Sequence, residues 1–285
     1  MDAQPIPLIY VLGVAHSGTT LTDLLLGSHS RIESLGEVHK YWHFLSPRSP
    51  RPQRKRICTC GEPIVQCEYW AAVRAGIRER LGSDDIDLED AEPAAFARNN
   101  AALFEVVRGH TGKPVLCDSS KWPRRLEQLL ASPAFEVHIA HLVRDCRAVA
   151  LSYRRRRKSP LPAALRWQSM NLRWARGGRI SRAAASYTLL RYEDLVADPE
   201  GAVTRLLHPL GLEPEPGQLR YGEHPHHNIS GNDMRITPEK QSIRQDTAYL
   251  RELGGWDWWL CTLGAAAALR HFQYPLLRPQ PAQAQ

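Results

Sequence analysis

The sequence contains no apolar run that approaches the roughly 18 to 20 residues needed to span a bilayer. Its first residues lead from Met1 straight into a strand-like segment, with neither the basic stretch nor the small-residue cleavage site of a secretory signal. Six cysteines are present among 285 residues, and in a chain of this size we expect them to be free thiols. Together these absences predict a cytoplasmic protein without a membrane span.

Internal repeats and recognisable nucleic-acid-binding modules are also lacking. The formal net charge is +7, and much of the excess lies in two basic runs, residues 48–56 and 154–157, neither of which carries interleaved aromatic residues. This charge favours an anionic ligand or partner but does not specify which. We expect no nucleic-acid partner. A basic nucleic-acid-binding protein remains an alternative, although it would give no role to the sequence patterns at residues 13–20 and 141–156.

Strand-like runs alternate with helical patterns along the chain, which predicts an α/β fold with a central parallel sheet between two helical layers. The predicted strands cover residues 6–14, 114–118, 137–143 and 187–191. The predicted helices cover residues 20–27, 70–81, 94–108, 123–130, 147–156, 162–182 and 255–271. We expect one domain over residues 1–277, with an irregular insertion rich in Cys, Arg and Pro at 46–69 and a disordered tail at 278–285.

The stretch "GVAHSGTT" (13–20) joins the first predicted strand to the first predicted helix. Gly13 ends the strand, and Gly18 allows the backbone to approach an anion closely. The free N–H groups and the positive dipole end of the helix favour a bound phosphate. The alternative is an ordinary strand-to-helix turn capped by a hydroxyl side chain.

This loop lacks the lysine that nucleoside-triphosphate loops place on the β and γ phosphates, because Thr19 stands at that position. No predicted strand ends in the aspartate arrangement expected of a magnesium-holding partner, apart from residues 137–145, where Arg144 intervenes before Asp145. The loop is therefore predicted to hold an anion without an obligatory metal. A metal-dependent nucleotide kinase, or another phosphotransferase with such a loop, remains an alternative.

A second pattern, "HLVRDCRAVALSYRRR" (141–156), places Arg144 at the end of a predicted strand and Ser152 eight residues later on a helix. A cation at the carboxyl end of a strand and a hydroxyl two turns along can bind one phosphate together. The alternative is an arginine paired with Asp145 and a serine on an ordinary helix.

These two patterns, in this order, resemble those of the sulfotransferases that use 3′-phosphoadenosine 5′-phosphosulfate (PAPS). "GVAHSGTTL" is similar to their 5′-phosphosulfate loop and "LVRDCRAVALS" to their 3′-phosphate motif. "LLRYEDLVADP", "HHNISGNDMRI" and "CTCGEPIVQCEYW" are similar to further segments of bacterial members. The resemblance implies a P-loop-like α/β fold and in-line transfer of a sulfuryl group from PAPS to a hydroxyl or amine. The product would be 3′-phosphoadenosine 5′-phosphate (PAP), and no metal would be required.

The resemblance also assigns nucleotide-binding residues. His16 stands where the family usually has a lysine or arginine beside the bridging oxygen, and its dependence on protonation predicts lower activity at high pH. The residues implied to bind the nucleotide are Gly13, His16, Ser17, Gly18, Thr19, Thr20, Leu21, Arg144, Ser152, Arg156, Tyr192, Gly231, Asn232 and Arg235.

Three residues are the candidates for catalysis. Glu37 aligns with the catalytic glutamate of the protein-tyrosine sulfotransferase branch, and a carboxylate is a competent general base if burial raises its pKa. A surface glutamate at a helix start is the alternative, and His39 is the second candidate base. Lys121 suits the equatorial oxygens of the transferring group, unless it is a solvated lysine at a helix start. His16 would stabilise charge on the bridging oxygen.

Cys58, Cys60 and Cys67 form a C-x-C-x6-C pattern, with His39 and His43 upstream. The spacing matches no common zinc finger, so we expect a rigid loop and no metal site, and a disulfide also stays open. A second histidine group is expected to be loop residues near the nucleotide and not ligands. Its members are His224, His226 and His227. The acceptor, whether carbohydrate, peptide tyrosine, lipid or natural product, and the oligomeric state are not specified by the sequence.

Overall fold

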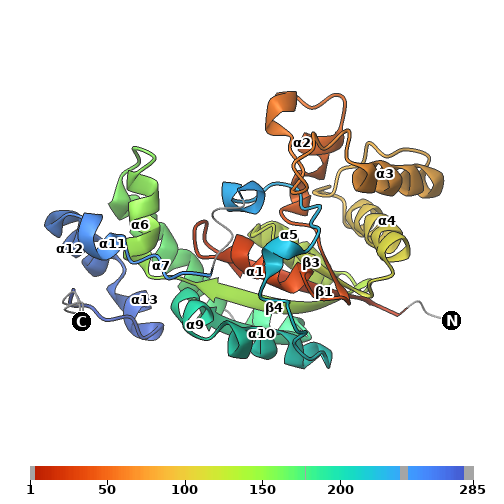
Figure 1. Cartoon of the computed structure of the whole chain (residues 1–285). Helices are drawn as coiled ribbons and strands as arrows, with labels where there is room; N and C mark the ends of the chain where they lie inside the picture. The colour runs from red at the N-terminus through yellow and green to blue at the C-terminus, as the bar shows by residue number, and fades with distance from the viewer. Residues whose placement is uncertain (1–3, 177, 238–242, 279–285) are drawn as a thin grey trace.

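A five-stranded sheet forms the centre of the molecule in the computed structural model, which describes residues 4–176, 178–237 and 243–278. All neighbouring strands are parallel, in the order β2-β3-β1-β4-β5 (Figure 1). Because the chain turns to one side of β1 first and to the other side later, the carboxyl end of β1 lies where such sheets bind ligands. The strands are β1 (Ile6–Gly13), β2 (Ile32–Ser34), β3 (Val115–Asp118), β4 (Phe135–Val143) and β5 (Ser186–Arg191).

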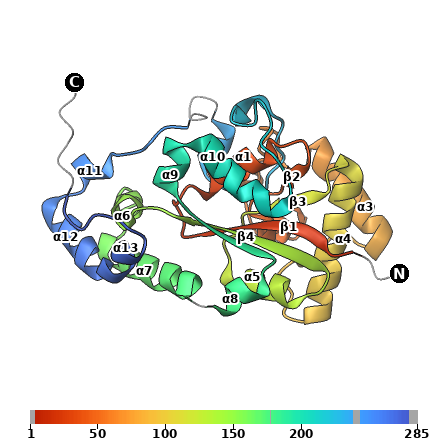
Figure 2. The same ribbon diagram turned by 90° about the horizontal axis from the view of Figure 1, so that it is seen from below.

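Alternate side chains of β1 pack against two separate helical layers. Ile9 and Val11 belong to the core beneath α1 (Thr19–Gly27), α9 (Tyr192–Ala197) and α10 (Pro199–Leu207). Leu8 and Leu12 belong to the larger core beneath α4 (Pro93–Thr111), α5 (Pro123–Ala131) and α7 (Pro160–Arg176). This two-residue period is that of a strand covered on both faces. Figure 2 shows the two helical layers on opposite sides of the sheet, and the predicted three-layer α/β fold is confirmed.

Shorter elements surround this framework. The further α-helices are α2 (Tyr41–Leu45), α3 (Glu68–Leu81), α6 (Cys146–Arg154), α8 (Arg179–Ala183), α11 (Tyr249–Glu252), α12 (Gly255–Gly264) and α13 (Ala266–His271). Short 3-10 turns cover Val38–Lys40, Gln53–Lys55, His208–Leu210, Tyr221–Glu223 and Asp233–Ile236. No helix in the described part of the chain is both long and apolar enough to cross a membrane.

The elements differ from the sequence prediction at a few places. Strand β2 was not predicted, because three residues show no periodicity. The predicted helix 162–182 is two helices, since α7 ends at Arg176 and α8 begins at Arg179. The predicted helix 255–271 is divided at Ala265, whose φ of −121° is not helical. Beyond Arg278, the predicted tail lies outside the described residues.

Candidate functional site

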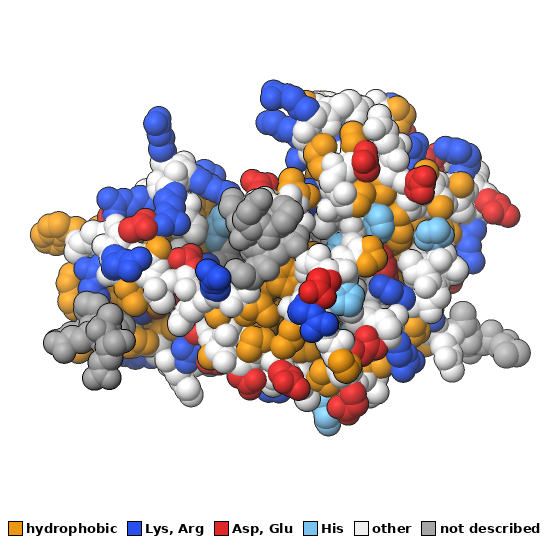
Figure 3. Space-filling model, in the orientation of Figure 1, with side chains coloured by type: hydrophobic (Ala, Val, Ile, Leu, Met, Phe, Trp, Pro, Cys, Tyr) orange, Lys and Arg blue, Asp and Glu red, His pale blue; other side chains and the backbone are white. Residues whose placement is uncertain are grey.

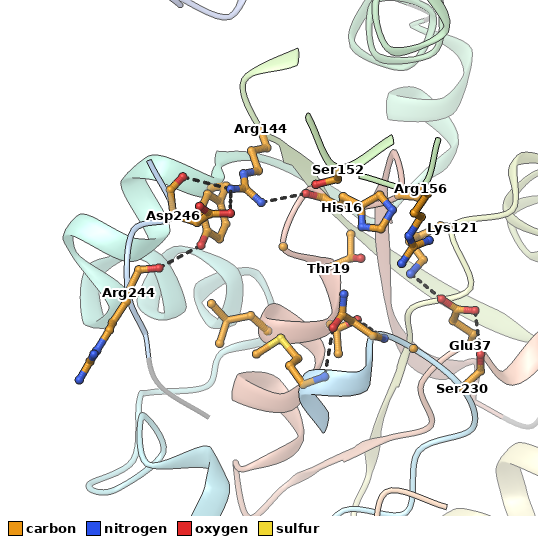
Figure 4. Close-up of a pocket in the computed structure, with 18 of the residues that line it drawn as sticks. His16, Thr19, Glu37, Lys121, Arg144, Ser152, Arg156, Ser230, Arg244 and Asp246 are labelled. Atoms are coloured by element: carbon orange, nitrogen blue, oxygen red, sulfur yellow. Dashed lines mark hydrogen bonds and ion pairs between the residues drawn. The ribbon is translucent and has the colours of Figure 1, made fainter. Parts of the chain in front are cut away.

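Every strand of the sheet delivers a pocket residue just beyond its carboxyl end. His16 follows β1, Glu37 follows β2, Lys121 follows β3, Arg144 follows β4 and Tyr192 follows β5. Figure 4 shows the first four reaching toward one cavity, whose volume is about 620 Å³. Predicted site residues that line this pocket are His16, Gly18, Thr19, Thr20, Leu21, Glu37, Lys121, Arg144, Ser152, Arg156, Tyr192, Gly231 and Asn232.

Three predicted residues lie outside the pocket wall. Gly13 is required by packing, because a Cβ there would lie 2.8 Å from the carbonyl oxygen of Leu142. Ser17 is fully buried, with no hydrogen-bond partner for its Oγ among the described residues. The guanidinium of Arg235 donates to Thr59 Oγ1 and to the carbonyl oxygen of Ile57, so it fastens the 46–69 insertion. Direct nucleotide binding by these three residues stays a prediction.

The phosphate loop is shaped by a close approach between Gly18 and Tyr192. Gly18 has φ +92°, and a Cβ there would lie 2.5 Å from Tyr192 Cδ2. Helix α1 then begins at Thr19, and its first-turn N–H groups have no carbonyl partner within the helix. Asn232 donates its backbone N–H to Thr20 Oγ1 at 3.2 Å, which brings the late loop over this helix end. The arrangement is a ready anion site with a covering segment.

Three residues of the pocket wall other than glycine have left-handed backbone conformations. They are His16 (φ 72°), Lys121 (φ 60°) and Ser230 (φ 60°). Such conformations cost of order 1–3 kcal/mol and are typical of functional sites. The three residues come from different loops but line the same cavity, so their backbone strain is gathered around that cavity.

Glu37 is held by two lysines. Its Oε1 accepts a hydrogen bond from Lys121 Nζ at 2.7 Å, and its Oε2 is paired with Lys40 and accepts from Ser230 Oγ at 3.2 Å. Burial alone would raise the pKa of Glu37, but the ammonium groups of Lys121 and Lys40 outweigh it and lower the pKa to about 2. The raised pKa that a base requires is therefore not present in the ligand-free site.

A buried ion pair fixes the turn that carries Lys121. Asp118, at the end of β3, accepts from Arg125 Nε at 2.7 Å and from the backbone N–H of Ser120 at 2.8 Å. Neither side chain of the Asp118–Arg125 pair is exposed to solvent. Because a broken buried pair would leave an uncompensated charge, this pair strongly favours a single conformation of the turn. Lys121 thereby projects into the pocket from a rigid base.

His16 is neutral at physiological pH in this site. Burial, followed by the nearby Arg156, Lys121 and Arg144, lowers the pKa of His16 to about 4. The imidazole is already neutral at pH 6 in the ligand-free site, and the expectation that activity falls at high pH through loss of its proton stays a prediction. A neutral imidazole still donates one hydrogen bond.

Arg144 is held over the ring of Tyr192, with its guanidinium carbon 4.4 Å from the ring centre. Its nitrogens donate to the Asp246 carboxylate at 3.0 Å and to the carbonyl oxygen of His16 at 3.3 Å. Ser152 lies on the Arg144 side of the pocket, and Arg156 lies beside His16 and Lys121 (Figure 4). The structure thus lines one pocket with Arg144 and Ser152, the two residues predicted to bind the 3′-phosphate, and adds a carboxylate as the present partner of Arg144.

Several wall residues were missed from the sequence. Lys40 lies three residues after Glu37 on the following 3-10 turn, and that spacing was the available signal. Asp246 and Arg244 come from a segment without periodicity, where no sequence pattern indicated a role. His39, the second candidate base, is not among the wall residues of this pocket and stacks on Trp122 with ring centres 6.4 Å apart. The other missed wall residues are Ala15, Ser230 and Met234.

The order of the strands and the glycine-containing loop between β1 and α1 define an α/β protein with a P-loop-like fold. Residues 7–216 match the model of the sulfotransferase family, and the chain belongs to that family. No curated protein matches the chain significantly.

Two solved structures share the fold. The sulfotransferase domain from the Synechococcus PCC 7002 olefin synthase has a TM-score of 0.56 at 19% identity, covering 97% of this chain and 98% of that one. The sulfotransferase domain from the curacin biosynthetic pathway has a TM-score of 0.58 at 17% identity, covering 96% of this chain and 100% of that one. At these identities the likeness establishes the fold.

Proposed function

We propose that this enzyme transfers a sulfuryl group from PAPS to a hydroxyl or amine of an acceptor and releases PAP. The observation that carries the proposal is a single pocket with two anion-binding regions. One is the start of α1 with His16, Lys121 and Arg156, and the other is Arg144 with Ser152 (Figure 4). A nucleotide with phosphate groups on both its 5′ and 3′ positions has the charge distribution that such a pocket complements.

The 5′-phosphosulfate would bind at the first region. The N–H groups of the first turn of α1 and the Thr19 and Thr20 hydroxyls suit the phosphate oxygens. Lys121 suits the sulfuryl oxygens, and the neutral imidazole of His16 can donate to the bridging oxygen, where negative charge develops as the bond breaks. Thr19 in place of a lysine, which was the first sign against a triphosphate, is consistent with this donor.

The 3′-phosphate would bind at the second region. Arg144 has its guanidinium fixed by the Tyr192 ring, and one of its nitrogens already binds the carboxylate of Asp246. A phosphate would replace that carboxylate as the partner of Arg144, with a further donor from Ser152. Asp246, which is partly exposed, would then turn to solvent.

The reaction is proposed as a direct in-line displacement. The acceptor oxygen or nitrogen forms a bond to sulfur while the bond from sulfur to the bridging oxygen breaks and leaves its electron pair on PAP. The acceptor proton passes to Glu37. When Lys121 turns from Glu37 to the sulfuryl oxygens, the pKa of Glu37 rises from about 2, because the first of its two ammonium partners is withdrawn. Donor binding would thereby activate the base, and the step uses no metal.

Thermal shift separates this proposal from its alternatives. PAP at 100 times its Kd should stabilise the protein by about 2.7 kcal/mol, whereas ATP with magnesium and short oligonucleotides should not. A shift with ATP and magnesium alone would support a phosphotransferase and overturn the proposal. Figure 3 shows Lys and Arg side chains on two protruding parts of the surface. Because such side chains could bind nucleic acid, the test includes oligonucleotides. Sulfated products are then sought by mass spectrometry across pools of carbohydrate, peptide and small-molecule acceptors.

A further inference from the structure

The C-x-C-x6-C pattern meets a histidine from a distant part of the chain. The Sγ atoms of Cys58, Cys60 and Cys67 and a ring nitrogen of His227 all lie within 4.8 Å of one another. Cys58 and Cys67 are buried, and Cys60 lies at the surface. Sequence reasoning had paired the cysteines with His39 or His43 and had assigned His227 to the nucleotide loop, so the fourth member of this cluster comes from tertiary structure alone.

Three of the six distances between these atoms are close to those of ligands around one zinc ion. The Sγ atoms of Cys60 and Cys67 are 3.8 Å apart, and His227 Nδ1 lies 3.7 Å from Cys58 Sγ and 3.3 Å from Cys67 Sγ. Tetrahedral zinc, with bonds of about 2.3 Å to sulfur and about 2.0 Å to nitrogen, requires edges of about 3.8 Å between sulfurs and about 3.6 Å between sulfur and nitrogen. The cluster therefore needs little rearrangement to bind the ion.

The local backbone also suits a metal site. Gly61 follows Cys60 with φ +93°, and its N–H donates to the carbonyl oxygen of Cys58 at 3.0 Å, which closes a tight turn around the first two cysteines. His227 is oriented on both sides: its ring stacks on Tyr69 with centres 4.6 Å apart, and its carbonyl oxygen accepts from Trp70 Nε1 at 2.7 Å. These two contacts hold His227 in position beside the cysteines.

A disulfide explains the cluster less well. A disulfide requires an S–S distance of about 2.05 Å, whereas all six cysteines of this chain are free in the structure. One disulfide would also leave the third thiol and the aligned histidine without a role. Four ligands fill a tetrahedral site completely, so a metal here would have no open position for a substrate and would be structural.

The cluster is continuous with the wall of the catalytic pocket. Ile229, two residues after His227, forms bridges with both Cys58 and Gly36, and its carbonyl oxygen accepts the backbone N–H of Glu37 at 2.7 Å. Ser230, the next residue, donates to the Glu37 carboxylate. A link between the 46–69 insertion and His227 (orange and light blue in Figure 1) would therefore hold the segment that positions Glu37.

We propose that Cys58, Cys60, Cys67 and His227 bind one zinc ion in a closed structural site that fixes the insertion against the Glu37 side of the pocket. Binding replaces the three thiol protons, which go to solvent, and leaves a neutral imidazole and three thiolates on the ion. This site goes beyond the proposed sulfuryl transfer, in which the ion takes no part.

Metal analysis of the full-length chain tests the proposal. Protein purified without chelators should contain one zinc per chain by elemental analysis, and Cys67→Ser and His227→Ala should lose most of it. Cys261→Ala, which removes a buried cysteine outside the cluster, should retain the full content. Wild-type protein that holds no zinc after incubation with Zn²⁺ under reducing conditions overturns the proposal, as does an intact Cys60–Cys67 disulfide in the purified protein.

Cobalt substitution tests the same site in the wild-type protein, so the result does not depend on whether the variants fold. Wild-type protein loaded with Co²⁺ should show the intense visible bands of tetrahedral thiolate coordination, and chelation should lower Tm and expose three additional thiols to a reagent. Weak bands of six-coordinate Co²⁺ would contradict the assignment. Zinc content needs no sulfuryl donor, so a zinc-loaded protein that fails to bind PAP would overturn the proposed function and leave this site standing.

Discussion

Lys121 Nζ lies 2.7 Å from Glu37 Oε1, so the candidate base and the candidate cation of the reaction neutralise each other in the ligand-free pocket. The two residues follow β2 and β3, which are neighbours in the sheet although the residues are 84 positions apart in the chain. An anion that draws Lys121 away would release the carboxylate. In the proposed reaction this ion pair would link donor binding to activation of Glu37 as the base.

Replacement of Glu37 should separate chemistry from binding. We expect Glu37→Gln to lower kcat by roughly 10²- to 10⁴-fold, because the amide cannot accept the acceptor proton, while PAP binding is kept. The measurement is steady-state kinetics together with PAP titration by calorimetry. Glu33→Gln is the matched control, since Glu33 lies on β2 just before Glu37 and pairs with Lys113, and neither residue lines the pocket wall. Unchanged kcat in Glu37→Gln would rule out the base assignment.

Removal of the Arg144 guanidinium should abolish recognition of the 3′-phosphate. Loss of a hydrogen-bonded charge pair costs about 2 kcal/mol or more, so Arg144→Ala should weaken PAP binding by at least about 30-fold. The preference for PAPS over adenosine 5′-phosphosulfate, which lacks the 3′-phosphate, should collapse. Arg155→Ala serves as control, because Arg155 pairs with Glu252 at the surface. If the variant retains the donor preference, Arg144 does not bind this phosphate.

Asp246 should weaken nucleotide binding, because its carboxylate occupies Arg144 before the donor arrives. We expect Asp246→Asn to bind PAP more tightly by several-fold, since the amide pairs less strongly with the guanidinium and carries no charge to repel the phosphate. Titrations of both proteins at low and moderate salt measure this. Weaker binding in the variant would instead indicate that Asp246 orients Arg144 for the nucleotide.

Stability should rise as the pH increases from 4 to about 6.5. Four histidines have a pKa lowered to about 4, in each case first through burial: His16, His39, His141 and His226. Their unfolded pKa is about 6.5, so the unfolded chain binds more protons in this window and the free energy of unfolding increases with pH. Above 6.5 this contribution is complete.

Three carboxyl groups whose pKa is raised by burial act in the opposite direction: Asp23, Glu89 and Glu193. The pKa of Asp23 rises to about 6, so the folded state binds the extra proton between about 4 and 6 and this group lowers stability as the pH rises. The four histidines outnumber these carboxyl groups, and we expect a net increase. Urea unfolding at pH 4.5, 5.5, 6.5 and 7.5 measures the profile, and a flat or falling curve below pH 6.5 would contradict the histidine assignments.

Gly18→Ala should damage the phosphate loop more than backbone strain alone can explain. The added Cβ would lie 2.5 Å from the Tyr192 ring, so the ring or the loop must move. Gly82→Ala is the control: Gly82 also has a positive φ, but a Cβ there meets nothing within 4 Å, and we expect a cost of roughly 1–2 kcal/mol. The comparison needs Tm and PAP affinity for both variants. Equal losses of Tm and PAP affinity in the two variants would show that the Gly18–Tyr192 contact has no special role.

Local patterns predicted the framework of the sheet because they depend on near neighbours in the chain. The run of apolar residues in β1, the glycines of the loop and the leucines of α1 were sufficient to predict a strand, a turn and a helix. β2 was missed because three residues show no periodicity. Without β2, the sequence could not show why Glu37 lies at the edge of the sheet. The lowered pKa of Glu37 was also beyond sequence reasoning, since it depends on Lys121 from another strand.

By itself the sequence determined the fold class, the phosphate loop without its lysine and the Arg144–Ser152 pair, because each is encoded within about a dozen consecutive residues. Only the tertiary structure decided that Asp246 is the present partner of Arg144, and that His227 completes the cysteine cluster. These contacts join residues about 100 to 170 positions apart, and no local pattern reports them. They arise where the order of parallel strands and the packing of long loops bring distant segments to one edge of the sheet.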